Sequence, residues 1–289
     1  MRLTLQPSDE LGRLLDRSTA DFTSALDVYA RALLDGKRTE PYFEEIHRLI
    51  WQTQALADLY GRRRVRLYAR NLERRASYAD TTPIVPNVPF EQAIADLVAR
   101  EPILATTAPL VQEVYERHGF TLARATETQV IQRVRDMMAQ AMRTGTKVDR
   151  VTWVMEGMGD FDRAYGETVY RNAVTNAHVG GTFREVEEPG IDAVIGGLMY
   201  VATEDSQTRP NHLAADGLVA APRDPVWHQC APPNGHRCRC GLNLVDWVTL
   251  EDRYGWKRGR TPPRASVPPG FHRDPGFSGG RPDMSIYGG

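Results

Sequence analysis

The first half of the chain carries apolar residues three or four positions apart, a spacing that gathers side chains on one face of a helix. The stretches that show this spacing, and that we predict as helices, are residues 8–36, 39–72, 90–100 and 124–143. The first begins at a capping signature, Ser8-Asp9-Glu10, and ends at Gly36. Two interior features could divide these helices, Ser18 to Thr23 in the first and Gly61 in the second. Residues 80–89 are rich in proline and predict an irregular connection.

The pattern changes in the second half. Residues 161–178 predict one more helix, stopped by Gly180-Gly181, while residues 196–203 and 242–248 predict strands. The intervening segment, residues 204–241, is rich in Pro, Asn, Asp and Gly and predicts a long irregular stretch. From Lys257 onward, prolines and glycines replace aliphatic residues, which predicts a flexible tail. We therefore expect an α+β fold with a helical region over 1–150, a small α+β domain over 151–256 and a tail over 257–289.

One predicted helix has an unusual polar stripe. Arg171, Asn172, Thr175 and Asn176 lie within two turns, so several of them share one face. Two interpretations are open. The stripe is either a solvated face or a surface that hydrogen-bonds the loop-rich segment downstream.

Composition narrows the class of protein. The chain has 289 residues, a net charge of −1, 41% hydrophobic and 25% charged residues, which is typical of a soluble globular protein. Because the charge is balanced, nucleic-acid contact would need a local basic patch. No apolar run is long enough to span a bilayer, and the N-terminus lacks the features of a signal peptide. We expect a protein of the cytoplasm, or of a particle assembled there, with no membrane contact.

Candidate metal ligands are concentrated in the irregular segment. All three cysteines (Cys230, Cys238 and Cys240) and three of the seven histidines (His212, His228 and His236) fall within residues 204–240. Thiolate and imidazole groups are the preferred ligands of structural zinc. The Cys238-x-Cys240 spacing is tighter than a standard zinc knuckle, so buried thiols that pack as small hydrophobic groups are the alternative. If zinc binds, we expect Cys238, Cys240 and His212 to hold it before Cys230.

Catalysis and phosphate binding are two other functions that the residue types suggest. Asp205, His212 and Asp216 bracket a polar loop, but the chain has no phosphate-binding glycine loop and no GxSxG or HExxH motif. We therefore predict no catalytic residues. The second candidate is a basic run at helical spacing, which suits phosphate contacts or an acidic partner; its residues are Arg62, Arg63, Arg64, Arg66 and Arg70. The alternative for this run is a solvated helix face balanced by neighbouring carboxylates.

The irregular segment also resembles a known family. Its residues follow the order D-x-x-T-R-x-x-H-x-x-x-D-G, formed by Asp205, Thr208, Arg209, His212, Asp216 and Gly217. Trp227, Pro233, Asn234, Gly235 and the Cys238-Arg239-Cys240 triplet follow. This signature resembles that of the phage Mu F-like family of head morphogenesis proteins, over about residues 165 to 248. Cys230 looks additional to the family pattern.

The resemblance implies a minor capsid protein of a tailed phage or prophage, associated with the portal vertex and acting in head assembly and DNA packaging or delivery. It implies no enzymatic activity. The portal protein is the expected partner, with scaffold, major capsid protein and double-stranded DNA as further candidates. The signature residues would then hold their own loop together, with Asp205 pairing with Arg209, His212 anchoring the loop and the cysteines closing it. A DNA-binding or DNA-escort protein and a metal-dependent enzyme (a nuclease or toxin-associated domain) stay open as alternatives.

Overall fold

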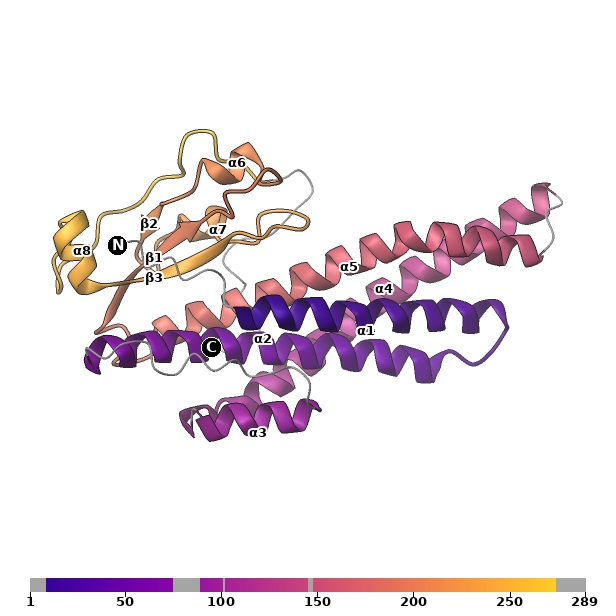
Figure 1. Cartoon of the computed structure of the whole chain (residues 1–289), viewed down its shortest axis with the longest axis horizontal. Coiled ribbons are helices and arrows are strands. Elements are labelled where there is room, and N and C mark those ends of the chain that lie inside the picture. The colour runs from indigo at the N-terminus through magenta and orange to yellow at the C-terminus, as the bar shows by residue number, and fades with distance from the viewer. Residues whose placement is uncertain (1–8, 75–88, 101, 145–147, 274–289) are drawn as a thin grey trace.

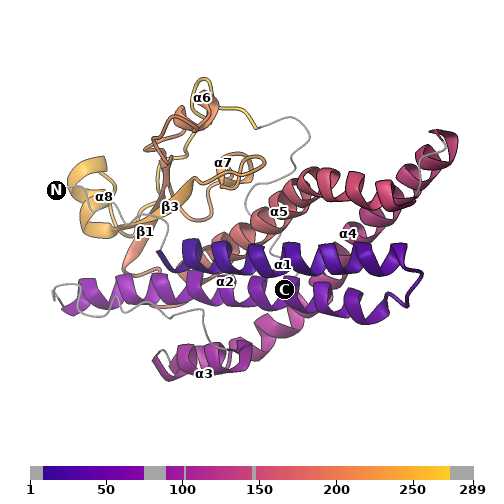
Figure 2. The same cartoon turned by 45° about the vertical axis from the view of Figure 1, so that its right-hand side comes forward.

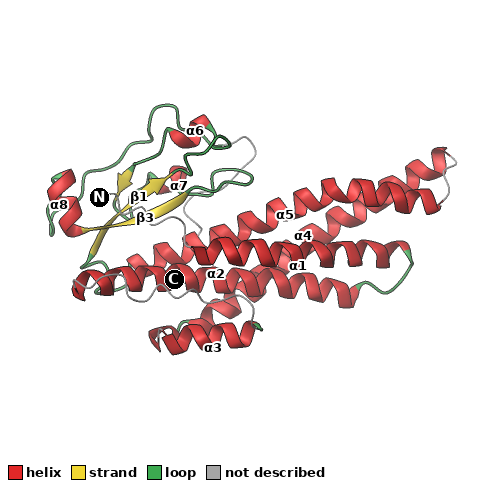
Figure 3. Ribbon diagram, viewed as in Figure 1, coloured by secondary structure: helices red, strands yellow, loops and turns green. Residues whose placement is uncertain are grey.

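The computed structural model describes residues 9–74, 89–100, 102–144 and 148–273 (Figure 1). Long helices form one layer, and a small part that contains the sheet lies on one side of it (Figures 1 and 3). The helical layer comprises α1 (Asp9–Leu34), α2 (Glu40–Arg74), α3 (Phe90–Arg100), a 3-10 turn η1 (Pro102–Ala105), α4 (Ala108–Thr144) and α5 (Val148–Val186). The sheet-containing part follows α5 in the chain. The α+β fold class that we predicted is confirmed.

Helix α2 lies at the centre of the helical layer, where it packs against α1, α4 and α5. The buried residues of this core include Phe22, Ile46, Ile50 and Tyr170. Phe22 stacks on Tyr170 with ring centroids 4.4 Å apart, and the Tyr170 hydroxyl donates to Thr53 Oγ1 at 2.6 Å. The helical spacing of the apolar residues therefore predicted the buried faces of α1 and α2 correctly. The two views in Figures 1 and 2 show that the far ends of α4 and α5 extend beyond α1 and α2.

The predicted breaks at Gly61 and at Gly180-Gly181 are wrong, since α2 and α5 run through them. The reason is that these glycines lie where the two helices touch. A Cβ on Gly61 would overlap the His178 carbonyl oxygen, and a Cβ on Gly181 would overlap the Asp58 carbonyl oxygen. Close backbone contact compensates for the low helix propensity of glycine. Helix α1 is likewise continuous through Ser18, whose hydroxyl donates to the Leu14 carbonyl oxygen at 2.6 Å.

The domain boundary that we expected near residue 150 falls inside α5, a helix of the helical layer. Helix α5 begins at Val148 and packs against α1, α2 and α4, so the helical region continues to Val186. Among the described residues, no helix is both long enough and apolar enough to cross a bilayer. Most of the proline-rich connection expected at residues 80–89 lies outside the described residues.

The sheet has the order β2-β1-β3, with both pairings antiparallel. Its strands are β1 (Ile195–Val201), β2 (Val219–Ala220) and β3 (Gly241–Asp246). The two predicted strands are confirmed, but the second ends at Asp246. There, Asp246 caps helix α8 (Trp247–Tyr254) by accepting a hydrogen bond from the Thr249 N–H at 2.9 Å. Gly255, with φ of 67°, ends the helix.

A second core joins the sheet to the helices. It includes Val65 of α2, Phe183 of α5, Tyr200 of β1 and Trp227 of α7 (Trp227–Cys230). The Phe183 and Trp227 rings meet edge to face, with centroids 6.1 Å apart. The sheet-containing part thus rests on α2 and α5 through a continuous buried apolar surface.

Part of the segment that we expected to be a flexible tail, residues 257–289, makes defined contacts with the rest of the molecule. Residues 264–273, here called the C-terminal strap, lie along the sheet-containing part. The Ala265 N–H donates to Asp224 Oδ2 at 2.8 Å, and Asn211 Nδ2 donates to the His272 carbonyl oxygen at 2.6 Å. Phe271 is 9% exposed and packs against the Tyr200 ring. Phe271, the partly buried Ala265 and Val267, and a few polar contacts therefore attach a segment whose composition predicts flexibility. Residues 274–289 lie outside the described residues.

Candidate metal centre and signature loops

Three of the four predicted metal ligands come together. His212 lies in the short helix α6 (Pro210–Leu213), and Cys238 and Cys240 immediately precede β3. The Sγ atoms of Cys238 and Cys240 each lie 3.7 Å from His212 Nδ1, and the three ligand atoms lie within 4.8 Å of one another. All three side chains are buried.

This donor set fits a zinc ion. Zinc takes thiolate and imidazole ligands, and its tetrahedral bond lengths separate a sulfur from a nitrogen by roughly 3.5 Å. The two observed sulfur–nitrogen distances of 3.7 Å are close to that value. Three protein ligands leave a fourth coordination position for water or another group.

The two cysteines differ in acidity. The pKa of Cys238 is lowered to about 7, chiefly because the Cys240 thiol donates a hydrogen bond to it, with backbone N–H groups adding to the effect. The pKa of Cys240 is raised because it is the donor in that bond and because it is buried. The hydrogen bond from Cys240 thus favours the thiolate form of Cys238 by lowering its pKa, and the thiolate is the form in which cysteine binds a metal.

The structure does not bring Cys230 to this cluster. Cys230 ends α7, is fully buried in the second core, and has a pKa raised to about 11 by burial. Its backbone carbonyl accepts a hydrogen bond from Asn234 Nδ2 at 3.0 Å. Cys230 therefore packs as a small apolar side chain, and it offers a matched control for experiments on the other two cysteines.

Asp205, for which we expected a pairing with Arg209, forms a two-pronged ion pair with Arg239, with N–O distances of 2.5 and 2.8 Å. It also accepts hydrogen bonds from the Gln207 N–H and the Thr208 hydroxyl. The Arg239 guanidinium is the main reason that the pKa of Asp205 is lowered to about 2. Arg209 donates to the His236 carbonyl oxygen at 2.6 Å. Both arginines therefore connect the α6 loop to residues 236–243, here called the cysteine segment.

The other signature residues also make internal contacts. Asp216 Oδ1 accepts from the Ala202 N–H at 2.8 Å, and Gly217, with φ of 76°, takes a left-handed conformation that favours glycine. Trp227 is fully buried, and its Nε1 donates to the Ala221 carbonyl oxygen at 2.8 Å. Asn234 Nδ2 also reaches the Tyr200 hydroxyl at 3.3 Å. Pro233 and Gly235 lie in the same buried turn as Asn234.

Two contributors were not among the site residues that we predicted. Asp224 accepts hydrogen bonds from the Val226 and Ala265 N–H groups, which joins the α7 turn to the C-terminal strap. Arg273 donates to the carbonyl oxygens of His228 and Gln229, at the end of α7. Asp224-Pro225 is a recognisable turn signal, but nothing in the local sequence indicates that Arg273 lies beside α7.

One residue of the polar stripe on α5, Asn172, reaches the loop-rich segment, as the second of the two interpretations expects. Arg237 Nε donates to Thr168 Oγ1 at 3.1 Å, and Asn172 Nδ2 lies 3.5 Å from His236 Nδ1. Arg171 pairs with Asp16 of α1 instead. The cysteine segment is therefore anchored on α5 just before Cys238.

The arginine run does not form the exposed positive surface that we expected. Arg62 and Arg63 are 3% and 2% exposed. Arg62 pairs with Asp58 at 2.6 Å, and Arg66 pairs with Glu185 of α5. Arg64 donates to the Leu242 carbonyl oxygen at 2.8 Å. The run faces α5 and β3, because the charged residues lie on the side of α2 that the sheet-containing part covers. Arg70 is half-buried.

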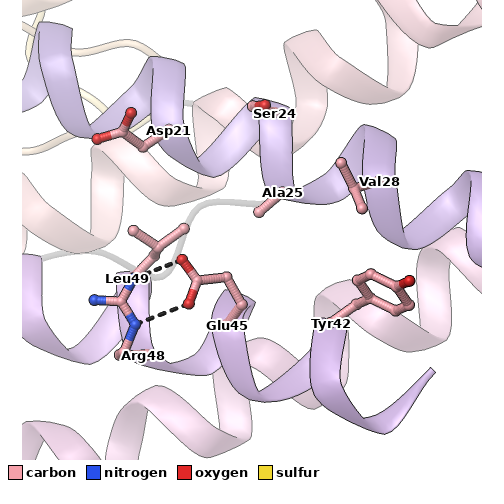
Figure 4. A pocket seen from close by; sticks show the side chains of 8 residues that line it. All are labelled: Asp21, Ser24, Ala25, Val28, Tyr42, Glu45, Arg48 and Leu49. Carbon is pink, nitrogen blue, oxygen red and sulfur yellow. Dashed lines mark hydrogen bonds and ion pairs between the residues drawn. The ribbon is translucent and has the colours of Figure 1, made fainter. Parts of the chain in front are cut away.

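A groove lies between α1 and α2, away from the signature loops (Figure 4). It has a volume of about 320 Å³. Its apolar lining comes from Ala25, Val28 and Leu49, and its polar lining is formed by Asp21, Ser24, Tyr42, Glu45 and Arg48. Glu45 and Arg48 are paired with each other, as Figure 4 shows. The groove is open to a partner that brings an apolar side chain.

Comparison with known proteins identifies the C-terminal region. Residues 132–243 match the family model of phage Mu protein F like proteins. The chain is 27% identical over 154 residues to the Mu-like prophage FluMu F protein of Haemophilus influenzae, covering 47% of this chain and 36% of that relative. It is 22% identical over 156 residues to the putative capsid assembly protein F of Escherichia phage Mu, covering 46% of this chain and 35% of that relative. The chain thus spans little more than a third of each relative's length. No solved structure matches it at a significant level.

Proposed function

The chain belongs to the phage Mu F-like family through residues 132–243, and from this premise we propose that it acts in assembly of the phage head. The observation that carries the proposal is the similarity to the capsid assembly protein F of phage Mu. The signature residues bond to one another and to neighbouring loops, and Trp227 packs on Phe183 of α5, which suits a structural module of a particle. On this proposal the chain is a minor capsid protein located in the virion at the portal vertex, contributing to DNA packaging or delivery without enzymatic activity.

The proposed contact with the portal protein uses the helical layer. The groove between α1 and α2 combines an exposed apolar side chain, Val28, with a carboxylate at Asp21. Val28 is 45% exposed, so its apolar side chain is accessible to a partner at this groove. A partner helix or loop that inserts an apolar residue there would bury this surface.

Co-purification tests the proposal. A tagged chain co-expressed with the portal protein of the same phage is expected to elute with the portal ring. Val28→Glu should weaken this association, because a carboxylate cannot enter an apolar contact without a desolvation cost. Val248→Glu is the matched control, since Val248 is 68% exposed on α8, in the other part of the molecule. A wild-type chain that elutes apart from both the portal ring and assembled heads would contradict the proposal.

We further propose that His212, Cys238 and Cys240 hold a structural zinc ion. The support is the burial of all three ligands and the spacing of their donor atoms. Bound zinc supplies a cross-link between α6 and the cysteine segment, as structural zinc sites do in small irregular domains. Elemental analysis of protein purified without chelators should find about one zinc per chain, retained in Cys230→Ser and lost in Cys238→Ser. Wild-type protein with only trace metal would contradict this assignment.

A further inference from the structure

The stretch that carries the two cysteines also carries the contacts between the sheet-containing part and the helices. On one side of Cys238, His236 and Arg237 bond to Asn172 and Thr168 of α5. On the other side of Cys240, the Leu242 carbonyl oxygen accepts from Arg64 of α2. The cysteine segment is therefore the place where the metal site, α5 and α2 meet.

The third ligand belongs to a different set of contacts. Asn211, the neighbour of His212 in α6, donates to the His272 carbonyl oxygen of the C-terminal strap. Phe271 of the strap packs on Tyr200, whose hydroxyl accepts from Asn234. The strap is thus fixed to the neighbour of His212 and, through Arg273, to α7, and the helices are fixed to the cysteine side.

Two direct contacts across the site lie at its surface. The Asp205–Arg239 pair has side chains 39% and 44% exposed, and Arg209 donates to the His236 carbonyl oxygen at 2.6 Å. Exposed ion pairs contribute little to stability because water and salt screen them. A thiol next to an imidazole forms only a weak hydrogen bond.

From this arrangement we propose that metal binding at His212, Cys238 and Cys240 is energetically coupled to the docking of residues 236–243 on α5 and α2. The metal joins His212, whose neighbour contacts the C-terminal strap, to Cys238 and Cys240, whose neighbours contact α5 and α2. This inference rests on the zinc site proposed above and adds a regulatory consequence, since loss of metal loosens the attachment of the sheet-containing part to the helices.

Amide hydrogen exchange on the full chain tests the coupling. With zinc added and then removed by a chelator, the peptides that cover residues 164–176 of α5 and 60–70 of α2 should exchange several-fold faster in the metal-free protein. Peptides from the α1–α2 turn, far from the site, provide the internal reference. Faster exchange confined to residues 205–240 would overturn the proposal, because the metal would then order only its own loop.

Linkage supplies a second, independent measurement. If metal binding favours docking, then weakening docking must weaken metal binding by the same factor. Arg237→Gln removes the bond to Thr168 and touches no ligand, and we expect it to lower the affinity for zinc by about five- to tenfold. Arg253→Gln, at an exposed position on α8, is the matched control. Equal zinc affinity in both variants would overturn the proposal.

These outcomes separate the coupling between metal binding and docking from the proposed role in head assembly. A chain that elutes with the portal ring but shows no change in α5 exchange on metal removal would contradict the coupling alone. A chain whose exchange responds as expected but which joins neither portal nor heads would contradict the assembly role alone.

Discussion

Gly181 of α5 lies directly against Asp58 of α2, so that a methyl group at position 181 would overlap the Asp58 carbonyl oxygen. Gly61 makes the reciprocal contact with the His178 carbonyl oxygen of α5. The two helices that carry the sheet-containing part thus cross at a pair of glycines, and their backbones approach more closely than any other residue would allow.

Substitution of these glycines should separate the helices. Gly181→Ala is expected to lower the free energy of unfolding by about 1–3 kcal/mol, because the added methyl group meets backbone that cannot rotate away. Gly12→Ala in α1 is the matched control. It has nothing within 4 Å of the added carbon and should stabilise the protein, by up to about 1 kcal/mol, through higher helix propensity. Urea unfolding of the two variants measures both effects, and equal shifts would contradict the packing account.

The buried ion pair between Arg62 and Asp58 should matter far more than an exposed one on the same helix. Arg62→Met removes the guanidinium that pairs with the buried Asp58 carboxylate, which is expected to cost about 3–5 kcal/mol. Glu45→Gln, which breaks the exposed pair with Arg48, should change stability by less than about 1 kcal/mol. Similar losses in the two variants, measured by urea unfolding, would show that burial does not set the strength of the Arg62 pair.

The ion pair between Asp205 and Arg239 makes the free energy of unfolding depend on pH in the acidic range. Since the pKa of Asp205 falls from 3.8 to about 2 on folding, the folded protein holds this carboxyl ionised at pH values where the unfolded chain protonates it. The pair therefore contributes stability above about pH 4, and this contribution is lost as the pH falls through 2. Unfolding curves between pH 5 and pH 2 should show a steeper loss for wild type than for Asp205→Asn. Parallel curves would contradict the assignment.

Removal of the Asp224 carboxylate should release the C-terminal strap. Asp224→Ala leaves the Val226 and Ala265 N–H groups without their acceptor, so the strap loses a contact that fixes its beginning. Limited trypsin digestion at Arg264 is expected to run faster in this variant than in wild type. Asp252→Ala, at an exposed position on α8, is the control and should leave the digestion rate unchanged.

Local sequence signals predicted the helices and strands well, and they failed where distant residues decide. The apolar spacing around Phe22 and Ile46 predicted the buried faces of α1 and α2, because helix periodicity is a local property. Gly61 looked like a break, because the helix that covers it lies more than a hundred residues away in sequence. Helix α8 was not predicted, and its first two residues, Trp247 and Val248, were assigned to a strand, although Asp246 and Gly255 are recognisable cap residues.

In the candidate site, too, some features could be predicted from local sequence and others depend on residues far away in the chain. Residue chemistry and the family resemblance ranked His212, Cys238 and Cys240 ahead of Cys230, and the structure brings those three together. The partner of Asp205 could not be inferred locally. Arg209 is four positions away, but the loop turns so that Arg239, 34 positions away, meets the carboxylate. The arginines of α2 were assigned to the surface because the sheet-containing part that covers them is encoded far downstream.

The central claim is that the signature segment fastens the C-terminal part of the chain through a metal held by His212, Cys238 and Cys240. The most direct test is the thermal unfolding midpoint of chelator-treated protein with and without added zinc. Zinc at about a hundred times its dissociation constant stabilises a folded protein by roughly 2.7 kcal/mol, so the midpoint should rise in wild type and in Cys230→Ser. It should not rise in His212→Ala. An unchanged wild-type midpoint, or an equal rise in His212→Ala, would contradict the claim.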